Sequence, residues 1–154
     1  MNQESVFIPK SVIDATLATP AVEGKRQLDP LKALALAGGV PINILEDTNI
    51  SNDVEVHRHE ADLWICLEGE VEFIVGGTLV EPWVKQLADG GTDDRELKSK
   101  NLEGGTSHVL RVGDVLWIPA GEPHLHRTTG TARLYIIKVP SAELVPLTYV
   151  RGWK

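Results

Sequence analysis

The sequence predicts an all-β barrel or sandwich in a single domain, preceded by a short extension. The chain has 154 residues, of which 42% are apolar, and this is the size and composition of one domain with a real core. From Val40 onward, short apolar runs are separated by turn residues, which is typical of an all-β domain. These turns are rich in Gly and Pro, which supply the backbone angles that hairpins need.

The first 39 residues show little strand-like alternation and are expected to form an N-terminal extension packed on a barrel of residues 40–154. One helix is predicted in this extension, from Leu31 to Ala37. Asp29 is placed as its N-cap and Pro30 as its first helical residue, and a pair of glycines follows as the stop signal.

Eight strands are predicted in the barrel, and a long segment from Pro82 to Gly105 interrupts them. A connection of about 24 residues, rich in charge and glycine, is typical of a lid or binding loop beside a pocket mouth. The alternative is a solvated surface insertion with short irregular strands. The eight predicted strands are Ile42 to Glu46, Val54 to His59, Leu63 to Leu67, Val71 to Val75, His108 to Val112, Val115 to Ile118, Leu125 to Thr129 and Ala132 to Val139.

Charge and composition narrow the possible partners. The net charge is −7, with 22 acidic against 15 basic residues, which argues against nucleic acid or an anionic membrane surface. The sequence has no apolar run long enough to span a bilayer and no signal-peptide pattern, so a cytoplasmic protein with a small-molecule ligand is expected. The single cysteine, Cys66, cannot form an internal disulfide and is expected to be a small buried apolar residue.

Four of the five histidines fall into two i, i+2 pairs, His57/His59 and His124/His126. On a β-strand, such residues project from the same face about 6.6 Å apart, so two imidazoles can converge on one point. Neutral imidazole is the commonest protein ligand for transition metals, and a mononuclear site needs at least three protein ligands. The sequence therefore predicts a metal site, with Asp62 as a candidate carboxylate ligand.

Two stretches of the sequence carry these residues. The first, from His57 to Gly69, reads HRHEADLWICLEG, and the second, from Gly113 to His124, reads GDVLWIPAGEPH. In order and spacing they resemble the two conserved motifs of the cupin superfamily, and the resemblance covers about Val40 to Pro140. The usual acidic ligand of the family is a glutamate three or four residues after the second histidine, whereas here Asp62 follows after two.

The resemblance is to a small single-domain metal-binding cupin of the cupin 2 type. It implies a double-stranded β-helix, or jelly-roll barrel, with the metal in its mouth. It implies that His57, His59, Asp62 and His124 bind one divalent transition metal, with iron first and manganese, nickel, zinc or copper as alternatives. Because aspartate is short and its spacing is reduced, Asp62 is predicted to reach the metal directly or through one water.

Other residues near the motifs are candidates for a substrate site. Trp64 and Trp117 lie in the motif strands and are candidates for a pocket wall, with barrel core as the alternative. Arg58 and Arg127 are candidate cationic anchors for an anionic substrate, although strand alternation favours an outward direction for both. His126 is a candidate acid or base, or a donor that orients a metal ligand, and a position on the barrel rim is the alternative.

Three histidines and a carboxylate leave coordination positions open for chemistry on a bound ligand. The first expectation is an oxidoreductase, a dioxygenase acting on a small chelating organic substrate. The second is a lyase, isomerase or decarboxylase of a small hydroxy or sugar acid, and the third is a non-catalytic binding cupin, because a fold does not choose among functions. A two-fold homodimer is also expected, since open sheet edges are templates for pairing.

Overall fold

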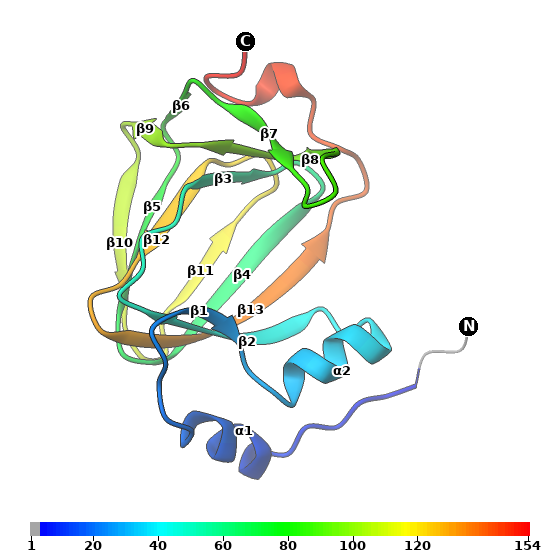
Figure 1. Ribbon diagram of the computed structural model, residues 1–154, viewed down its shortest axis with the longest axis vertical. Helices are drawn as coiled ribbons and strands as arrows, with labels where there is room; N and C mark the ends of the chain where they lie inside the picture. Colours follow the sequence, from blue (N-terminus) through cyan, green and yellow to red (C-terminus); the bar gives the residue numbers. More distant parts are fainter. Residues whose placement is uncertain (1–3) are drawn as a thin grey trace.

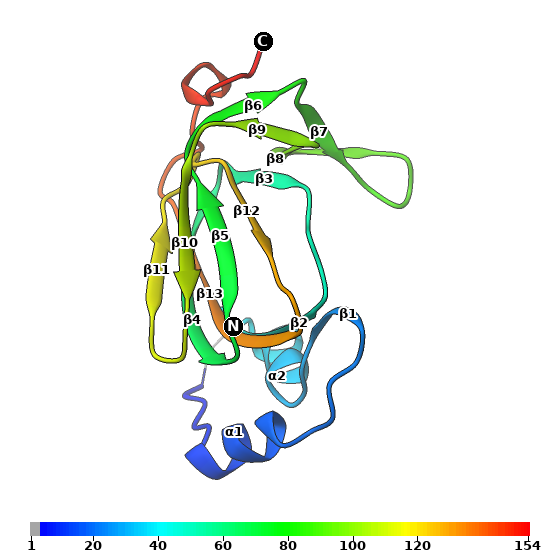
Figure 2. The same ribbon diagram turned by 90° about the vertical axis from the view of Figure 1, so that its left-hand side faces the viewer.

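Two antiparallel β-sheets face each other to form a barrel, and a small third sheet lies at one end of it (Figure 1, Figure 2). The computed structural model describes residues 4–154. The helical elements are α1 (Lys10–Leu17), α2 (Leu31–Gly38) and the 3-10 helix η1 (Leu147–Tyr149). The strands are β1 (Gly24–Gln27), β2 (Ile42–Thr48), β3 (Val54–His57), β4 (Glu60–Glu68), β5 (Val71–Val75), β6 (Thr78–Val80), β7 (Trp83–Gln86), β8 (Thr92–Ser99), β9 (Asn101–Glu103), β10 (Thr106–Leu110), β11 (Val115–Ile118), β12 (His124–Arg127) and β13 (Thr131–Pro140).

The strand order confirms the predicted all-β jelly-roll fold. One sheet has the order β1-β2-β13-β4-β11, the other has the order β10-β5-β12-β3-β8-β7, and β6 pairs with β9 in the third. All eight predicted strands are present, and β5 and β11 have the predicted bounds. The two α-helices lie at one end of the barrel, whereas β3, β7, β8 and the C-terminal segment lie at the other (Figure 1, Figure 2).

The main core fills the space between the two sheets because alternate residues of each strand point inward. Trp64 of β4 and Phe73 of β5 are its large aromatic members, with ring centroids 5.2 Å apart. Burying a side chain of this size stabilises the fold by about 1.5–3 kcal/mol. Cys66 lies in the same cluster, as predicted for a small buried apolar residue.

A second core cluster lies on the other face of β3. Val54 and Val56 of this strand are fully buried against Leu79 and Leu97, and Val150 from the C-terminal segment completes the cluster. Strand β3 is therefore packed on both faces, and its alternate residues face two different interiors.

The N-terminal extension is more regular than the sequence predicts. Helix α2 matches the predicted helix, but its N-cap is Pro30 and no side chain caps it, so the assignment of Asp29 as N-cap was wrong. Helix α1 and strand β1 were not predicted, because α1 has only eight residues without a capping side chain and β1 reads GKRQ with no apolar alternation. Strand β1 pairs with β2 and so joins the extension to the barrel sheet.

A buried arginine fastens this extension to the barrel. Arg133 of β13 donates hydrogen bonds to the backbone carbonyls of Leu17 and Thr19, both at 2.6 Å. Its guanidinium also pairs with the buried carboxylate of Glu46 at 2.9 Å, and Arg26 of β1 contacts the same carboxylate. Burial raises the pKa of Glu46, but the two arginines outweigh burial and hold this pKa below its usual value.

The long segment from Pro82 to Gly105 is mostly regular β-structure, not an irregular loop. Strands β7 and β8 form a hairpin at the edge of the six-stranded sheet, and β8 pairs directly with β3. Of the two alternatives, the structure shows strands in this segment, while its role as a lid stays a prediction. The first half of β8 has polar residues on both faces and pairs with β7, and its second half pairs with β3. No helix within residues 4–154 is both long and apolar enough to cross a bilayer.

Candidate metal centre

Three of the four predicted metal ligands converge at the end of the barrel away from the helices. His57 ends β3 and His124 begins β12 in one sheet, whereas Asp62 lies on β4 in the other. The Oδ2 atom of Asp62 lies 3.6 Å from Nε2 of His57 and 3.6 Å from Nε2 of His124. All three side chains are buried. The two sheets therefore bring two imidazoles and one carboxylate to a common point.

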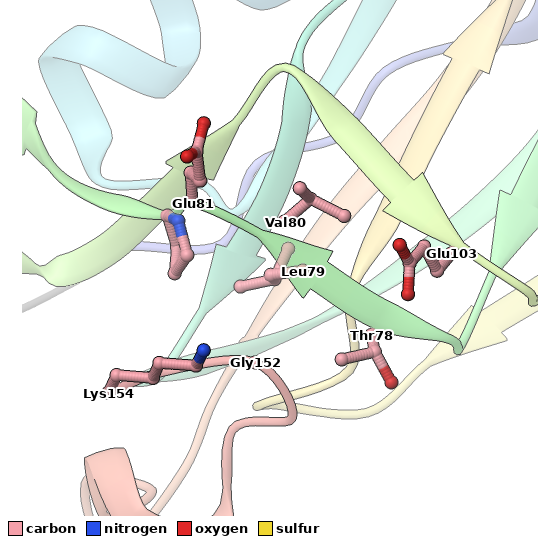
Figure 3. A pocket seen from close by; sticks show the side chains of 8 residues that line it. Thr78, Leu79, Val80, Glu81, Glu103, Gly152 and Lys154 are labelled. Carbon is pink, nitrogen blue, oxygen red and sulfur yellow. The ribbon is translucent and has the colours of Figure 1, made fainter.

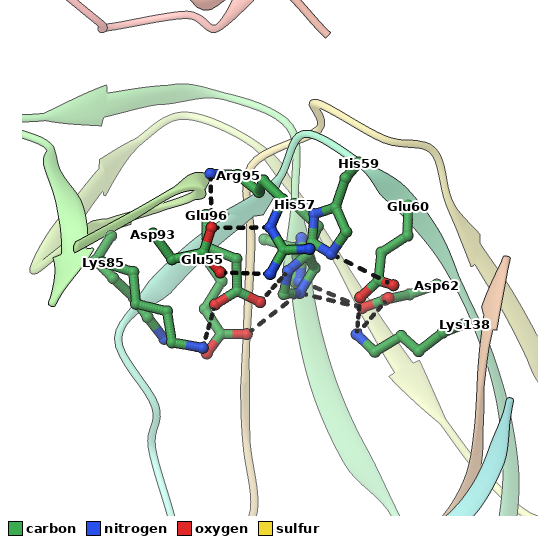
Figure 4. A network of polar contacts seen from close by, with 12 residues as sticks. Glu55, His57, His59, Glu60, Asp62, Lys85, Asp93, Arg95, Glu96 and Lys138 are labelled. Atoms are coloured by element: carbon green, nitrogen blue, oxygen red, sulfur yellow. Dashed lines mark hydrogen bonds and ion pairs between the residues drawn. The ribbon is translucent and has the colours of Figure 1, made fainter. Parts of the chain in front are cut away.

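His59, the fourth predicted ligand, lies beside this group with its ring turned to another partner. It sits in the turn after β3, and its ring centroid is 6.3 Å from that of His57. Its Nε2 atom lies 3.5 Å from the carboxylate of Glu60 (Figure 4). Ligation by His59 stays a prediction.

Lys138 explains how the short side chain of Asp62 is directed. Its Nζ atom donates a hydrogen bond to Oδ1 of Asp62 at 2.6 Å, which leaves Oδ2 facing the histidines (Figure 4). Within the described chain, Asp62 Oδ2 and His124 Nε2 are buried and have no hydrogen-bond partner. Unpaired buried polar atoms are costly, and these two atoms are of the kinds that ligate transition metals. The donor set therefore fits the divalent metal that the cupin motifs imply.

Glu55 is a second carboxylate at this site and was not among the predicted ligands. It precedes His57 by two residues on β3, faces the same interior, and is the cross-strand partner of His124. Its Oε2 atom lies 3.6 Å from His57 Nε2, and Glu55, His57 and His124 each offer a ligand atom within 4.8 Å of the others. The i, i+2 spacing that identified His57 and His59 would have found Glu55 if it had been extended one step back.

The two converging histidines have opposite electrostatic environments. Burial lowers the pKa of His57, but the carboxylates of Glu55 and Glu96 outweigh burial and raise it to about 9. Burial, together with the neighbouring His57, lowers the pKa of His124 to about 4. At neutral pH the metal-free site therefore holds a charged His57 and a neutral His124. A metal must displace the proton of His57 to bind there.

His126, the candidate acid or base, lies inside the barrel and not on its rim. Its Nε2 atom is 2.9 Å from the buried carboxylate of Asp47, and its backbone N–H donates to Asn52 Oδ1 at 2.8 Å. Its ring packs against Phe73 and Trp64, with centroids 5.0 and 5.4 Å away. These contacts fix His126 in the core, and its catalytic role stays a prediction.

The two tryptophans of the motif strands have different surroundings. Trp64 is buried in the main core, in agreement with the alternative stated for it. Trp117 is 52% exposed and lies on the opposite side of β11 from the core residues Leu116 and Ile118. Strand alternation places the Trp117 ring on the outer surface of the sheet, and its role in a pocket wall stays a prediction.

The predicted cationic anchors also have other partners. Arg58 is buried, and its guanidinium donates to the backbone carbonyls of Val145 at 2.8 Å and Asp94 at 2.6 Å. It therefore holds the C-terminal segment and the β7–β8 hairpin together, and substrate binding by Arg58 stays a prediction. Arg127 is exposed and pairs with Glu72 on the outer surface.

A separate surface pocket of about 390 Å³ lies between β6 and the C-terminal residues (Figure 3). The backbone N–H of Leu79 donates to the carbonyl of Arg151 at 3.0 Å beside it. Gly152 is needed for this approach, because a Cβ atom there would lie 2.1 Å from the carbonyl oxygen of Leu79. None of the candidate metal ligands lines this pocket; its lining residues are Thr78, Leu79, Val80, Glu81, Pro82, Glu103, Gly152 and Lys154.

Comparisons with known proteins show likeness in three-dimensional structure only. No protein-family model matches the sequence, and no curated protein sequence matches it. A solved structure of an oxalate oxidase is similar to 80% of the chain, with a TM-score of 0.47 and 19% identity. The Escherichia coli protein YcfD is similar to 66% of the chain, with a TM-score of 0.47 and 19% identity, and the cupin domain of Schizosaccharomyces pombe Cnp3 to 65%, with a TM-score of 0.44 and 14% identity.

The chain spans 53% of the oxalate oxidase, 26% of YcfD and 52% of the Cnp3 domain chain. Within this chain, the first motif ends β3 and runs through β4, and the second runs from before β11 to the start of β12. The two motifs thus lie on strands of the two facing sheets. With this strand arrangement and these two motifs, the chain has a cupin fold.

Proposed function

We propose that the protein binds one divalent transition metal through His57, His124 and Asp62, with His59 as a further ligand, and acts on a small organic molecule that chelates this metal. The observation that carries the proposal is the convergence of Asp62 Oδ2 with the Nε2 atoms of both buried histidines at 3.6 Å. Protein ligands in this number leave coordination positions for a chelating substrate.

The proposed reaction is that of an oxidoreductase, a dioxygenase with iron as its metal. Iron with this nitrogen-rich donor set would supply redox chemistry with dioxygen. The chain itself would hold the metal between its two sheets, through the histidines of β3 and β12 and the carboxylate of β4. The ion pair with Lys138 directs Asp62 toward the histidines.

A second candidate is a lyase, isomerase or decarboxylase that uses the metal as a Lewis acid on a small hydroxy or sugar acid. Glu55 favours it, because a second carboxylate makes the donor set richer in oxygen than the motifs alone imply. Oxygen-rich sites suit manganese. A third candidate is a non-catalytic binding protein, which would hold a small molecule at the same metal site without converting it.

Metal identity separates these candidates. We expect the purified protein to contain about one iron per chain, measured by elemental analysis, and the ferrous protein to bind nitric oxide as an oxygen surrogate with a new electron paramagnetic resonance signal. Manganese or zinc without nitric oxide binding would favour the Lewis-acid candidate. Metal binding without turnover of any chelating acid or phenol in a panel would favour the non-catalytic binding protein. A protein that takes up none of these metals would refute the proposal.

A homodimer also remains a proposal. Strands β10 and β11 are edge strands of the two sheets. Val109, Val115 and Trp117 on these strands are exposed large apolar residues. Apolar side chains beside open strand edges support pairing with a second copy of the chain.

A further inference from the structure

The side of His57 away from the metal group faces strand β8. In the pairing of β3 with β8, Glu96 is directly opposite His57. Its Oε1 atom lies 2.9 Å from Nδ1 of His57, whereas Nε2 of the same ring lies 3.6 Å from the carboxylates of Asp62 and Glu55 (Figure 4). The two nitrogens of the His57 imidazole therefore have different partners. Glu96 contacts Nδ1, the nitrogen that points away from Asp62.

Glu96 is itself held in place from the neighbouring strand. The Nζ atom of Lys85 on β7 lies 2.6 Å from Oε2 of Glu96, so the two carboxylate oxygens contact one cation and one imidazole (Figure 4). The Glu96 side chain is 15% exposed, and that of Lys85 is 37% exposed. The ion pair between Lys85 and Glu96 connects the two strands of the β7–β8 hairpin, so the conformation of this hairpin determines where the Glu96 carboxylate lies.

An imidazole needs such a partner to act as a well-placed metal ligand. The group bound to one ring nitrogen determines which nitrogen carries the proton and how the ring is turned. A carboxylate 2.9 Å from Nδ1 attracts the ring proton to that nitrogen by its charge, although the contact lacks hydrogen-bond geometry, and this leaves the Nε2 lone pair for a metal. His57 is the last residue of β3, and the backbone pairing around it fixes the strand but not the rotation of the imidazole ring.

We propose that Glu96, held by Lys85, is a positioning residue for the metal centre that fixes the His57 ring with Nε2 toward Asp62 and His124. This inference rests on the proposed function, since it requires a metal at that centre. Glu96 lies in the Pro82 to Gly105 segment, outside both cupin motifs, so the motifs do not assign it a role. The β7–β8 hairpin is then part of the metal site and not only a border of its mouth.

Cobalt(II) is a suitable probe, because its visible absorption reports ligand geometry as well as binding. We expect Glu96→Gln, which keeps the shape and removes the charge, to weaken Co²⁺ binding by about 10- to 100-fold in competition with a chelator. The absorption bands of the saturated variant should also change in position or intensity. Lys85→Met should weaken binding by a smaller factor, and Glu96→Asp should retain part of the affinity.

Glu103→Gln is the matched control, because Glu103 lies in the same segment on β9 and is exposed. It should leave Co²⁺ affinity and absorption unchanged. Wild-type affinity and wild-type absorption in Glu96→Gln would overturn the inference while the proposed function stands. Failure of the wild-type protein to bind Co²⁺ would overturn both. Should Glu96→Gln not fold, as judged by circular dichroism, Lys85→Met decides: unchanged Co²⁺ affinity and absorption in it would also overturn the inference.

Discussion

Replacing His57 with alanine is expected to lower the affinity for a divalent metal by more than about 100-fold, which exceeds the usual effect of residues that only support a ligand. The Nε2 atom of His57 faces both Asp62 and Glu55, so its loss removes the donor that these carboxylates share. Asp62→Ala is expected to cause a smaller loss, because Glu55 still offers a carboxylate to the site.

Stability measurements give a second readout of the same prediction. A metal at 100 times its dissociation constant should stabilise the wild-type protein by about 2.7 kcal/mol, and the same concentration should stabilise His57→Ala by less than about 0.4 kcal/mol. His108→Ala is the matched control, since His108 is exposed on β10 and should retain the full shift. A loss from Asp62→Ala that equals or exceeds the loss from His57→Ala would contradict this expected order and show that Asp62 contributes at least as much to metal binding.

Replacing Arg133 with methionine is expected to lower the free energy of unfolding by about 3–5 kcal/mol at neutral pH. The change leaves the buried carboxylate of Glu46 with Arg26 as its remaining partner, and it removes the hydrogen bonds to Leu17 and Thr19. Urea unfolding measures the difference, and Arg127→Met is the control. Arg127 forms an exposed ion pair with Glu72, which contributes at most about 1 kcal/mol.

The loss from Arg133→Met should depend on pH with a definite sign. Because the folded protein holds the pKa of Glu46 below its usual value, this carboxylate stabilises the fold above its unfolded-state pKa. That stabilisation disappears as the pH falls through the folded-state pKa. The difference between wild type and variant should therefore be largest near pH 7 and should shrink in acid. A difference that is the same in acid, or no larger than for Arg127→Met, would contradict the role given to Arg133.

Short apolar runs separated by turn residues were sufficient to predict the barrel strands, since these strands supply most of the buried apolar residues. The same signals failed for α1 and β1, whose stability comes from contacts with the barrel, including those of Arg133 and the pairing of β1 with β2. They failed again for β8, where Leu97 is the one apolar residue in the strand and pairing with β3 determines the structure.

Local spacing predicted the part of the candidate site that lies within the two motifs. His57, Asp62 and His124 meet as expected, because β12 pairs with β3 and Asp62 faces them from β4 in the other sheet. Glu96 and Lys138 could not be predicted, since they reach the site from strands whose cross-strand register the sequence does not reveal.

The two packed faces of β3 link parts of the protein that are remote in sequence. Glu55 and His57 face the metal group, while Val54 and Val56 on the same strand pack against Val150 in the second cluster. A displacement of β3 would therefore change both the geometry of the metal group and the packing of the second cluster. If repacking around Val150 moved β3, it would change the affinity for the proposed metal, and by reciprocity of coupling free energies the metal would change the packing free energy of the C-terminal segment by the same amount.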